Sequence, residues 1–235
     1  LYPSGRVWDV YQDVDRTVSQ LEPKEAKAYI ALLAEAKRLY EAAAPTFIEG
    51  QAPTRLALMR YGLQHGLSAH PNLTLPQLLE SYRASPDLTQ FFLRFATYFG
   101  ADPYRAPAVL HNIAWVELGL GVYYPTGGIA TVVDALARLA KDLGVDIQTG
   151  DKVERLEQQG AQISHVHTSQ GVFQADVVVS SLDIIRTHRL LGKATRLERL
   201  EPSLSGFVLL LGVLGKTPTL SHHTISFSND YTGEF

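Results

Sequence analysis

Cysteine is absent from the 235 residues of this chain, and its absence narrows the chemistry that the chain can carry. Without thiols there can be no disulfide bond, no thiolate metal ligand and no cysteine nucleophile. Long hydrophobic runs are also missing, because the longest strongly apolar stretch, Phe207–Leu214, is far shorter than the ~20 residues of a membrane-spanning helix. The net charge is only −3, and no basic stripe suggests a nucleic-acid partner.

Two motifs that would indicate an active site are absent as well. No G-x-S-x-G sequence occurs, so a serine nucleophile elbow is not predicted. No G-x-G-x-x-G follows a strand, so the loop that cradles a dinucleotide pyrophosphate is missing. His165 and His167 lie two apart on a predicted strand, but no acidic or histidine partner has matching spacing. We therefore predict no metal site.

The residues that are present indicate a globular protein with a large helical part. Hydrophobic residues make up 46% of the chain and charged residues 19%, which is an ordinary balance. The length suits one large domain or two modest ones. Apolar residues recur at helical spacing through residues 13–118. The predicted helices in this part are Val14–Leu21, Lys24–Ala44, Arg55–His65, Leu75–Tyr82, Asp87–Phe99 and Pro103–Leu118.

A different pattern runs from Gly121 to Asp183. An aromatic strand end is followed by a glycine pair and then by a helix over Ile129–Leu143 with one apolar face. Short strand patterns follow, and the last, Val177–Val179, has the continuous apolar character of a strand buried on both faces. This order predicts an α/β unit. Other predicted strands are Tyr2–Tyr11 (as a hairpin), Val145–Ile147, Val153–Leu156, Ile163–Thr168, Phe207–Leu214 and Thr224–Phe227.

Four stretches, in this order, resemble the bacterial carotenoid desaturases of the phytoene desaturase type, in the flavoprotein amine-oxidase superfamily. A sister desaturase acting on hydroxylated carotenoids fits comparably, because Thr89 stands where the phytoene enzymes carry an arginine. The resemblance covers most of Gly100–Phe235. The four stretches are Arg94–Pro107, Gly121–Gly128, Ala175–Asp183, and Ser205–Gly212 followed by His222-His223 and Asp230-Tyr231.

The resemblance implies a fold of mixed α+β and α/β class, with a helical substrate domain that has a small sheet and part of an FAD-binding α/β domain. Residues 1–120 would form the mainly helical, substrate-binding and membrane-facing domain. Residues 121–192 would belong to the FAD-binding domain, and residues 193–235 would return strands to the substrate-domain sheet. In this family the dinucleotide fingerprint opens the protein and a second flavin-contacting segment closes it. We therefore expect an internal fragment, with FAD bound in the intact enzyme but not here.

The resemblance makes two charged residues of one apolar helix, Asp87 and Arg94, candidates for catalysis. The family carries an acidic residue and an arginine near the start of this helix as candidate acid–base groups. Arg94 leans toward the apolar face, where a guanidinium needs a carboxylate partner. Asp87, Asp102 and Glu117 could supply it, and we favour a structural pair with Asp102 or Glu117. In the alternative, Arg94 faces the substrate and fixes a carboxylate that acts on it.

Four residues of the α/β part are candidates for contact with the cofactor. Gly127 and Gly128 could place free helix N–H groups near an anion or a ring carbonyl, although a tight turn also explains them. By resemblance, Val153 would contact the adenine through its backbone; otherwise it is an ordinary strand valine. Ser180 follows the buried strand, at the edge where ligands of open α/β sheets lie. Asp183 either joins that site or caps the next helix.

The resemblance implies an FAD-dependent carotenoid desaturase, which removes hydrogen from C–C bonds of a long polyene. The alternatives are another amine-oxidase-type flavoprotein, such as an amine or protoporphyrinogen-like oxidase, and an isolated helical module that binds lipid or protein. The expected partners are an apolar polyene and a membrane surface, the latter reached through helices near residues 53–82. No nucleic acid and no metal are expected. The expected location is the bacterial cytoplasm, peripheral to the inner membrane.

Overall fold

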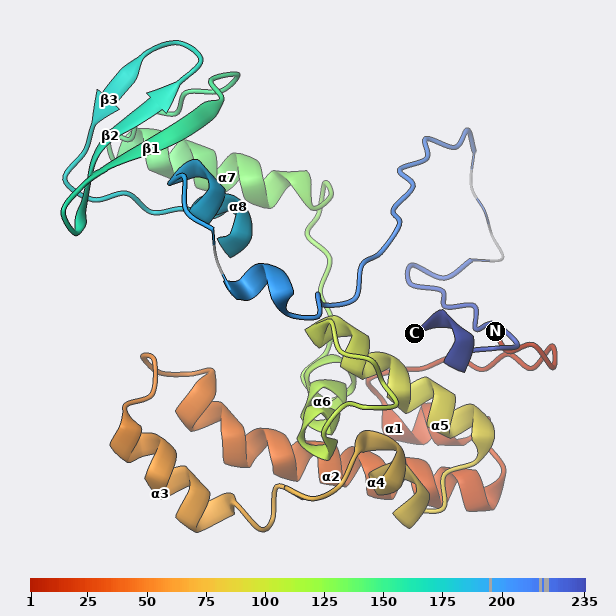
Figure 1. Ribbon diagram of the computed structural model, residues 1–235. Helices are drawn as coiled ribbons and strands as arrows, with labels where there is room; N and C mark the ends of the chain where they lie inside the picture. Colours follow the sequence, from red (N-terminus) through yellow and green to blue (C-terminus); the bar gives the residue numbers. More distant parts are fainter. Residues whose placement is uncertain (195, 216, 218–219) are drawn as a thin grey trace. The chain divides into compact units, whose positions relative to one another are not determined.

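The computed structural model describes residues 1–194, 196–215, 217 and 220–235. Its chain divides into two units, which are described separately (Figure 1). The first unit comprises Leu1–Tyr123 and Ser203–Phe235, and the second comprises Tyr124–Pro202. Residues 195, 216, 218 and 219, which belong to the segment predicted as return strands, lie outside the described residues.

The first unit is built mainly from helices. Its longest helix, α2 (Pro23–Phe47), has 25 residues and begins with a proline, whose missing N–H would have no partner at that position anyway. Buried residues recur along one side of α2 at spacings of three and four, as an amphipathic helix requires. The other elements of this unit are α1 (Val14–Val18), α3 (Arg55–His65), α4 (Leu75–Ser81), α5 (Pro86–Leu93), α6 (Asn112–Leu118) and the 3-10 helices η1 (Arg94–Phe99), η2 (Ala108–His111) and η4 (Thr232–Glu234).

Aromatic side chains join α2 to α5 in the core of this unit. Tyr29 of α2 and Phe92 of α5 are fully buried, with ring centroids 5.8 Å apart. Phe91 and Phe95 continue the cluster, 5.1 Å and 6.2 Å from Phe92 respectively. Because full burial of one such side chain is worth about 1.5–3 kcal/mol, this cluster is a main source of stability. It fixes α5, which carries Asp87, and η1, which begins with Arg94.

Most predicted helices are shifted by one to three residues at their ends, and two differ in type or by a longer stretch. The helix predicted over Asp87–Phe99 changes to a 3-10 helix at Arg94 and ends at Gly100, whose φ of 75° is the left-handed conformation that glycine tolerates. The helix predicted from Pro103 begins only at Ala108. The proline at position 107 disfavours helical geometry in the residue before it, and this delays the start.

The second unit combines helices with a small antiparallel sheet, so the α+β expectation is confirmed. Its three strands form a meander in the order β1-β2-β3, with Leu156 paired to Val166. The helix and the meander predicted for this part are both present. The elements are α7 (Ala130–Asp142), β1 (Val153–Gln159), β2 (Gln162–Thr168), β3 (Val172–Gln174), α8 (Ile184–Leu190) and the 3-10 helix η3 (Arg196–Arg199).

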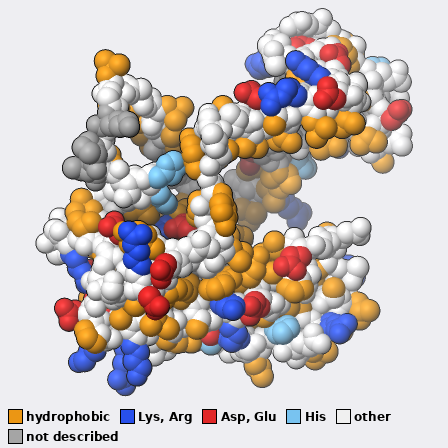
Figure 2. All heavy atoms as spheres, turned by 180° about the vertical axis from the view of Figure 1, so that it is seen from behind, with side chains coloured by type: hydrophobic (Ala, Val, Ile, Leu, Met, Phe, Trp, Pro, Cys, Tyr) orange, Lys and Arg blue, Asp and Glu red, His pale blue; other side chains and the backbone are white. Residues whose placement is uncertain are grey.

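The apolar face of α7 has the predicted spacing, but it is exposed within the second unit. Leu136 and Leu143 are 61% and 74% exposed, and hydrophobic side chains gather along the edge of this unit in Figure 2. Among the described residues of this unit, Leu156 is the only buried apolar side chain. The second unit therefore buries little apolar surface of its own.

Several predicted strands do not form, and those predictions are wrong for this chain. A strand requires a neighbour that pairs with its N–H and C=O groups. In the part of the chain that the structure describes, Val177–Val179 and Phe207–Leu214 have no paired strand. Val179 and Leu210 are accordingly 90% and 94% exposed. The segments Tyr2–Tyr11, Val145–Ile147 and Thr224–Phe227 likewise form no strand.

The terminal segments of the first unit do lie side by side, although they form no sheet (Figure 1). The Leu1 amino group donates to the Ile225 carbonyl oxygen over 2.8 Å, and the Phe227 N–H donates to the Leu1 carbonyl oxygen over 2.9 Å. The Tyr2 ring stacks on Phe227 with centroids 5.1 Å apart. The predicted sheet of terminal and return strands is thus limited to backbone contacts at Leu1.

Asp183 caps α8. Its Oδ1 accepts hydrogen bonds from the N–H groups of Ile185 and Arg186, at 2.9 and 3.3 Å. We expect Asp183→Ala to lower the free energy of unfolding by ~1 kcal/mol, because these N–H groups lose their acceptor. Asp183→Asn, which keeps an acceptor oxygen, should retain most of the cap's contribution to the free energy of unfolding. Chemical denaturation of the three proteins measures this; a normal midpoint for the alanine variant would exclude the cap.

Candidate functional site

Asp87 lies in the first turn of α5 and belongs to an ion-pair network. Its Oδ2 is 3.0 Å from an Arg6 guanidinium nitrogen, and Arg6 also pairs with Glu25 at 2.6 Å. The Arg6 guanidinium holds the pKa of the Glu25 carboxyl below its usual value, and the Ser85 hydroxyl, 2.5 Å away, contributes. The network ties the start of the chain to α2 and α5. Asp87 is therefore charge-paired, which sequence spacing alone did not reveal.

An open cleft of about 570 Å³ adjoins Asp87. Its wall combines the start of α5 with the first residues of the chain and a segment near the C-terminus, so that it joins parts far apart in the sequence. Tyr104 and Tyr231 supply aromatic surface there, with ring centroids 6.4 Å apart. The lining residues are Pro3, Ser4, Ala84, Pro86, Asp87, Thr89, Gln90, Leu93, Tyr104 and Ser228–Thr232.

Arg94 is almost completely buried, with 6% of its surface exposed. One guanidinium nitrogen lies 2.5 Å from Glu117 Oε1, and the other donates to the Tyr98 hydroxyl over 2.7 Å. The Tyr98 hydroxyl in turn donates to Glu117 Oε2 over 2.9 Å, which closes a triangle. The guanidinium also lies over the Phe95 ring, 4.1 Å from its centroid. The pairing of Arg94 with Glu117, one of the two favoured carboxylates, is confirmed; the structural role of this pair stays a prediction.

The other carboxylates proposed for Arg94 have partners of their own. Asp102 Oδ1 accepts a hydrogen bond from the Tyr104 N–H at 2.8 Å, within its own turn. Asp87 pairs with Arg6 as described above. The structure therefore gives the two catalytic candidates, Asp87 and Arg94, separate partners, and only Asp87 lines the open cleft.

The glycine pair before α7 forms a turn that other residues would strain. Gly127 and Gly128 have φ values of 89° and 94°, and the Gly128 N–H donates to the Pro125 carbonyl oxygen over 3.0 Å. A Cβ on Gly127 would stand 3.0 Å from the Thr131 methyl carbon. Backbone groups at such a turn can be approached closely by a ligand, so the turn fits contact with a dinucleotide.

The other two cofactor candidates also lie in the second unit. Val153 opens β1, where it pairs with Thr168 in the sheet. Ser180 lies before α8, and Thr187 lies within it. Their hydroxyl groups form a hydrogen bond of 2.8 Å. Both positions leave their backbone groups at the edges of regular structure, which is compatible with contact to an extended ligand.

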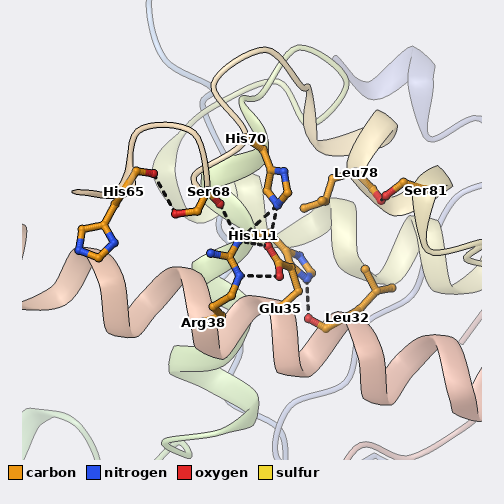
Figure 3. Close-up of polar contacts among 9 residues, drawn as sticks. All are labelled: Leu32, Glu35, Arg38, His65, Ser68, His70, Leu78, Ser81 and His111. Atoms are coloured by element: carbon orange, nitrogen blue, oxygen red, sulfur yellow. Dashed lines mark hydrogen bonds and ion pairs between the residues drawn. The ribbon is translucent and has the colours of Figure 1, made fainter. Parts of the chain in front are cut away.

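A polar cluster that the sequence did not indicate joins α2 to the segment after α3 (Figure 3). The buried Glu35 carboxylate accepts hydrogen bonds from Arg38 Nε at 2.9 Å and contacts His70 Nε2 at 2.7 Å. Arg38 also donates to the Ser68 carbonyl oxygen over 2.6 Å. Burial alone would raise the pKa of Glu35, but the hydrogen bonds from Arg38 and His70 outweigh it and lower the pKa. We call these four residues the α2 clasp.

His165 and His167 have an acidic neighbour after all. Glu157 on β1 lies 2.8 Å from His167 Nε2 and 3.8 Å from His165 Nδ1, so the strand pairing supplies what the sequence spacing did not. The Arg155 guanidinium competes for the same carboxylate at 3.2 Å. Within the described residues no group of three or more potential ligands is arranged to hold a metal ion.

The family model of the flavin-containing amine oxidoreductases matches residues 2–199. The chain belongs to this family.

Curated relatives refine the comparison. A 1-hydroxycarotenoid 3,4-desaturase of Flavobacterium sp. (strain P99-3) is 33% identical over 168 residues, which cover 70% of this chain and 34% of the relative. A zeta-carotene-forming phytoene desaturase of Myxococcus xanthus is 32% identical over 94% of this chain and 44% of its own. A 4,4'-diaponeurosporene oxygenase of Staphylococcus aureus is 28% identical over 97% of this chain and 48% of its own. The chain spans less than half the length of these relatives.

Proposed function

We propose that this chain is part of an FAD-dependent carotenoid desaturase, which removes hydrogen from C–C bonds of a long polyene. The observation that carries the proposal is the similarity to two carotenoid desaturases, one of them over 94% of the chain. The large helical unit supports it, because a polyene needs an apolar environment more than it needs polar catalytic groups. An amine or protoporphyrinogen-like oxidase and an isolated binding module are not favoured.

The proposal is tested in cells that accumulate phytoene or a 1-hydroxycarotenoid. The whole product of the gene that encodes this chain is expressed there, and pigments are separated by chromatography. Products with more conjugated double bonds than the starting polyene would support the proposal. Unchanged polyenes, in cells that contain the folded flavoprotein, would refute it.

We further propose that the first unit forms the substrate domain and that the second belongs to the flavin domain. Bound FAD would supply the oxidising power, by taking up hydrogen with its electron pair from the polyene. Gly127, Gly128, Val153 and Ser180 would lie along that cofactor. The glycine turn would let it approach the backbone, and the edges at Val153 and Ser180 would offer further main-chain contacts.

The chain alone is expected to retain no FAD, because it lacks the glycine-rich loop that normally anchors the pyrophosphate. After purification with added FAD and desalting, its spectrum should show no flavin absorbance near 450 nm, a typical flavin band. A yellow protein with close to one flavin per chain would contradict this expectation. It would mean that the second unit binds FAD tightly without the glycine-rich loop.

Asp87 is proposed to accept the proton that leaves the polyene, because it is the predicted acid–base residue that lines the open cleft. In the whole enzyme, Asp87→Asn should lower desaturation by ~10²–10⁴-fold, the usual contribution of a positioned base. The melting temperature should change little, because the ion pair with Arg6 is partly exposed. Asp102→Asn is the matched control and should keep its activity. Equal activity in both variants would remove Asp87 from the mechanism.

We propose that the protein works at the cytoplasmic face of the bacterial inner membrane, because a long apolar polyene dissolves in the bilayer. In the described part of the chain, no helix combines the length and the apolar character needed to cross a bilayer. A peripheral contact through the helical unit is compatible with this finding.

A further inference from the structure

The exposed side of α3 is unusually apolar for a solvent-facing helix. None of the residues of α3 is buried. Leu56, Met59 and Leu63 recur at the spacing of one helix face and are 75%, 66% and 87% exposed, and Leu67 beyond the helix is 92% exposed. We call these four side chains the α3 surface. Scattered apolar residues are common on proteins, but a continuous stripe marks a contact surface.

The charge along the segment that carries the α3 surface has one sign. Arg55 precedes Leu56 and Arg60 follows Met59, so the two exposed guanidinium groups flank the apolar stripe on both sides. No aspartate or glutamate occurs between Glu49 and Glu80, although the whole chain carries a net charge of −3. The stripe is thus the centre of a cationic segment in an otherwise slightly acidic chain.

We infer that the α3 surface docks onto an anionic lipid bilayer. An apolar stripe flanked by arginines matches the boundary of such a bilayer, where side chains enter the acyl region and cations meet phosphate groups. This inference rests on the proposed function, since a membrane-dissolved polyene requires the enzyme to reach the bilayer. Of the possible occupants, an anionic bilayer matches both the apolar stripe and the flanking arginines.

The α2 clasp holds the α3 surface in a fixed position. Glu35 and Arg38, one turn apart on α2, bind the main chain at Ser68 and the ring of His70, just beyond α3 (Figure 3). Within α3, the Tyr61 ring meets the Phe47 ring of α2 edge to face, with centroids 4.9 Å apart. Because the helix is held at Tyr61 and just beyond its C-terminal end, docking needs little ordering of the helix.

Vesicle sedimentation of the chain tests the inference without any enzymatic activity. Wild type should bind phosphatidylglycerol-containing vesicles more tightly than pure phosphatidylcholine vesicles. Arg55→Gln and Arg60→Gln should each weaken binding to the anionic vesicles about fivefold, because a cation near such a surface is worth about 1 kcal/mol. The double variant Leu63→Gln/Leu67→Gln should weaken binding to both kinds of vesicle at least about tenfold.

The matched control is Leu136→Gln/Leu139→Gln on α7, where the two leucines are 61% and 53% exposed. This variant makes the same two substitutions at exposed leucines of another helix and should bind vesicles like wild type. Wild-type binding by the α3 variants, or a loss in the α7 variant instead, would overturn the inference. If wild type is a dimer without lipid and the α3 variants are monomers, the surface instead binds a second copy, and the lipid assignment is wrong.

Site-specific labelling gives a second readout that does not depend on affinity. Since the chain has no cysteine, Leu63→Cys offers a single attachment point for an environment-sensitive dye. Its emission should shift to the blue with anionic vesicles, and a dye on Leu136→Cys should not respond. The reverse pattern contradicts docking through α3. A negative result here leaves the desaturase assignment intact, because the pigment test above does not use the α3 surface.

Discussion

Arg94→Met is expected to lower the free energy of unfolding by ~3–5 kcal/mol, the usual loss when one partner of a buried ion pair is removed. Arg94 is 6% exposed and bonds both Glu117 and Tyr98. Without the guanidinium, the Glu117 carboxylate would keep the Tyr98 hydroxyl as its one side-chain partner among the described residues. The stacking of the guanidinium over the Phe95 ring would be lost as well. Denaturant titration of the chain measures the loss.

The double variant Arg94→Met/Glu117→Leu separates a structural pair from a catalytic one. Replacing both charges by apolar groups should restore most of the stability, because no unpaired charge then remains buried. Tyr98→Phe, which removes one hydroxyl of the triangle, should have a smaller effect of about 1 kcal/mol. If Arg94→Met melts like wild type while the whole enzyme stops desaturating polyenes, Arg94 belongs to the active site and the structural account fails.

Acid is expected to destabilise the first unit through His111. This ring is fully buried; its Nε2–H donates to the Leu32 carbonyl oxygen over 2.8 Å, and its Nδ1 has no hydrogen-bond partner among the residues that the structure describes. Burial lowers the pKa of His111 from 6.5 to about 4, although the Leu32 carbonyl and Glu35 act in the opposite direction. The folded protein therefore holds this side chain neutral over a range in which the unfolded chain protonates it.

The sign of the effect follows from this difference. Stability from neutral His111 is complete above pH ~6.5 and is lost as the pH falls toward the pKa of the folded state, near 4. The full loss is about 3 kcal/mol, at about 1.4 kcal/mol for each pH unit of the shift. Denaturant titrations between pH 7 and 4 test it. His111→Gln, which can still donate to the Leu32 carbonyl oxygen, should make the free energy of unfolding depend less on pH between 6.5 and 4. If this dependence is unchanged in the variant, the acid sensitivity belongs to other groups.

Helices were predictable because a helix satisfies its own backbone. The apolar spacing in residues 24–44 and 129–143 needed only local hydrogen bonds to become α2 and α7. The strands Val177–Val179 and Phe207–Leu214 were predicted from equally clear patterns and did not form. Strand formation depends on a distant partner that the local sequence does not specify, and no such partner lies beside them in the described residues.

Among the ion pairs and hydrogen bonds between side chains, some could likewise be predicted from the sequence and others could not. Glu117 could be named as a partner of Arg94 because a buried guanidinium requires a carboxylate and few were near in sequence. The pairing of Arg6 with Asp87 and the α2 clasp could not be predicted, since each joins residues separated by 30 or more positions through the packing of helices. Of the cofactor roles, that of Val153 came from family resemblance alone, whereas those of Gly127, Gly128 and Ser180 also drew on turn and strand-end chemistry. They stay proposals.

The most direct measurement of the central claim is a single turnover of the whole flavoprotein without oxygen. The oxidised protein is mixed with liposomes that contain phytoene or a 1-hydroxycarotenoid, and flavin absorbance is followed while the pigment is analysed by mass spectrometry. The account predicts that the flavin is bleached in step with a polyene product that has lost two hydrogen atoms for each flavin reduced. A flavin that stays oxidised with both polyenes, yet is bleached by an amine, would contradict it.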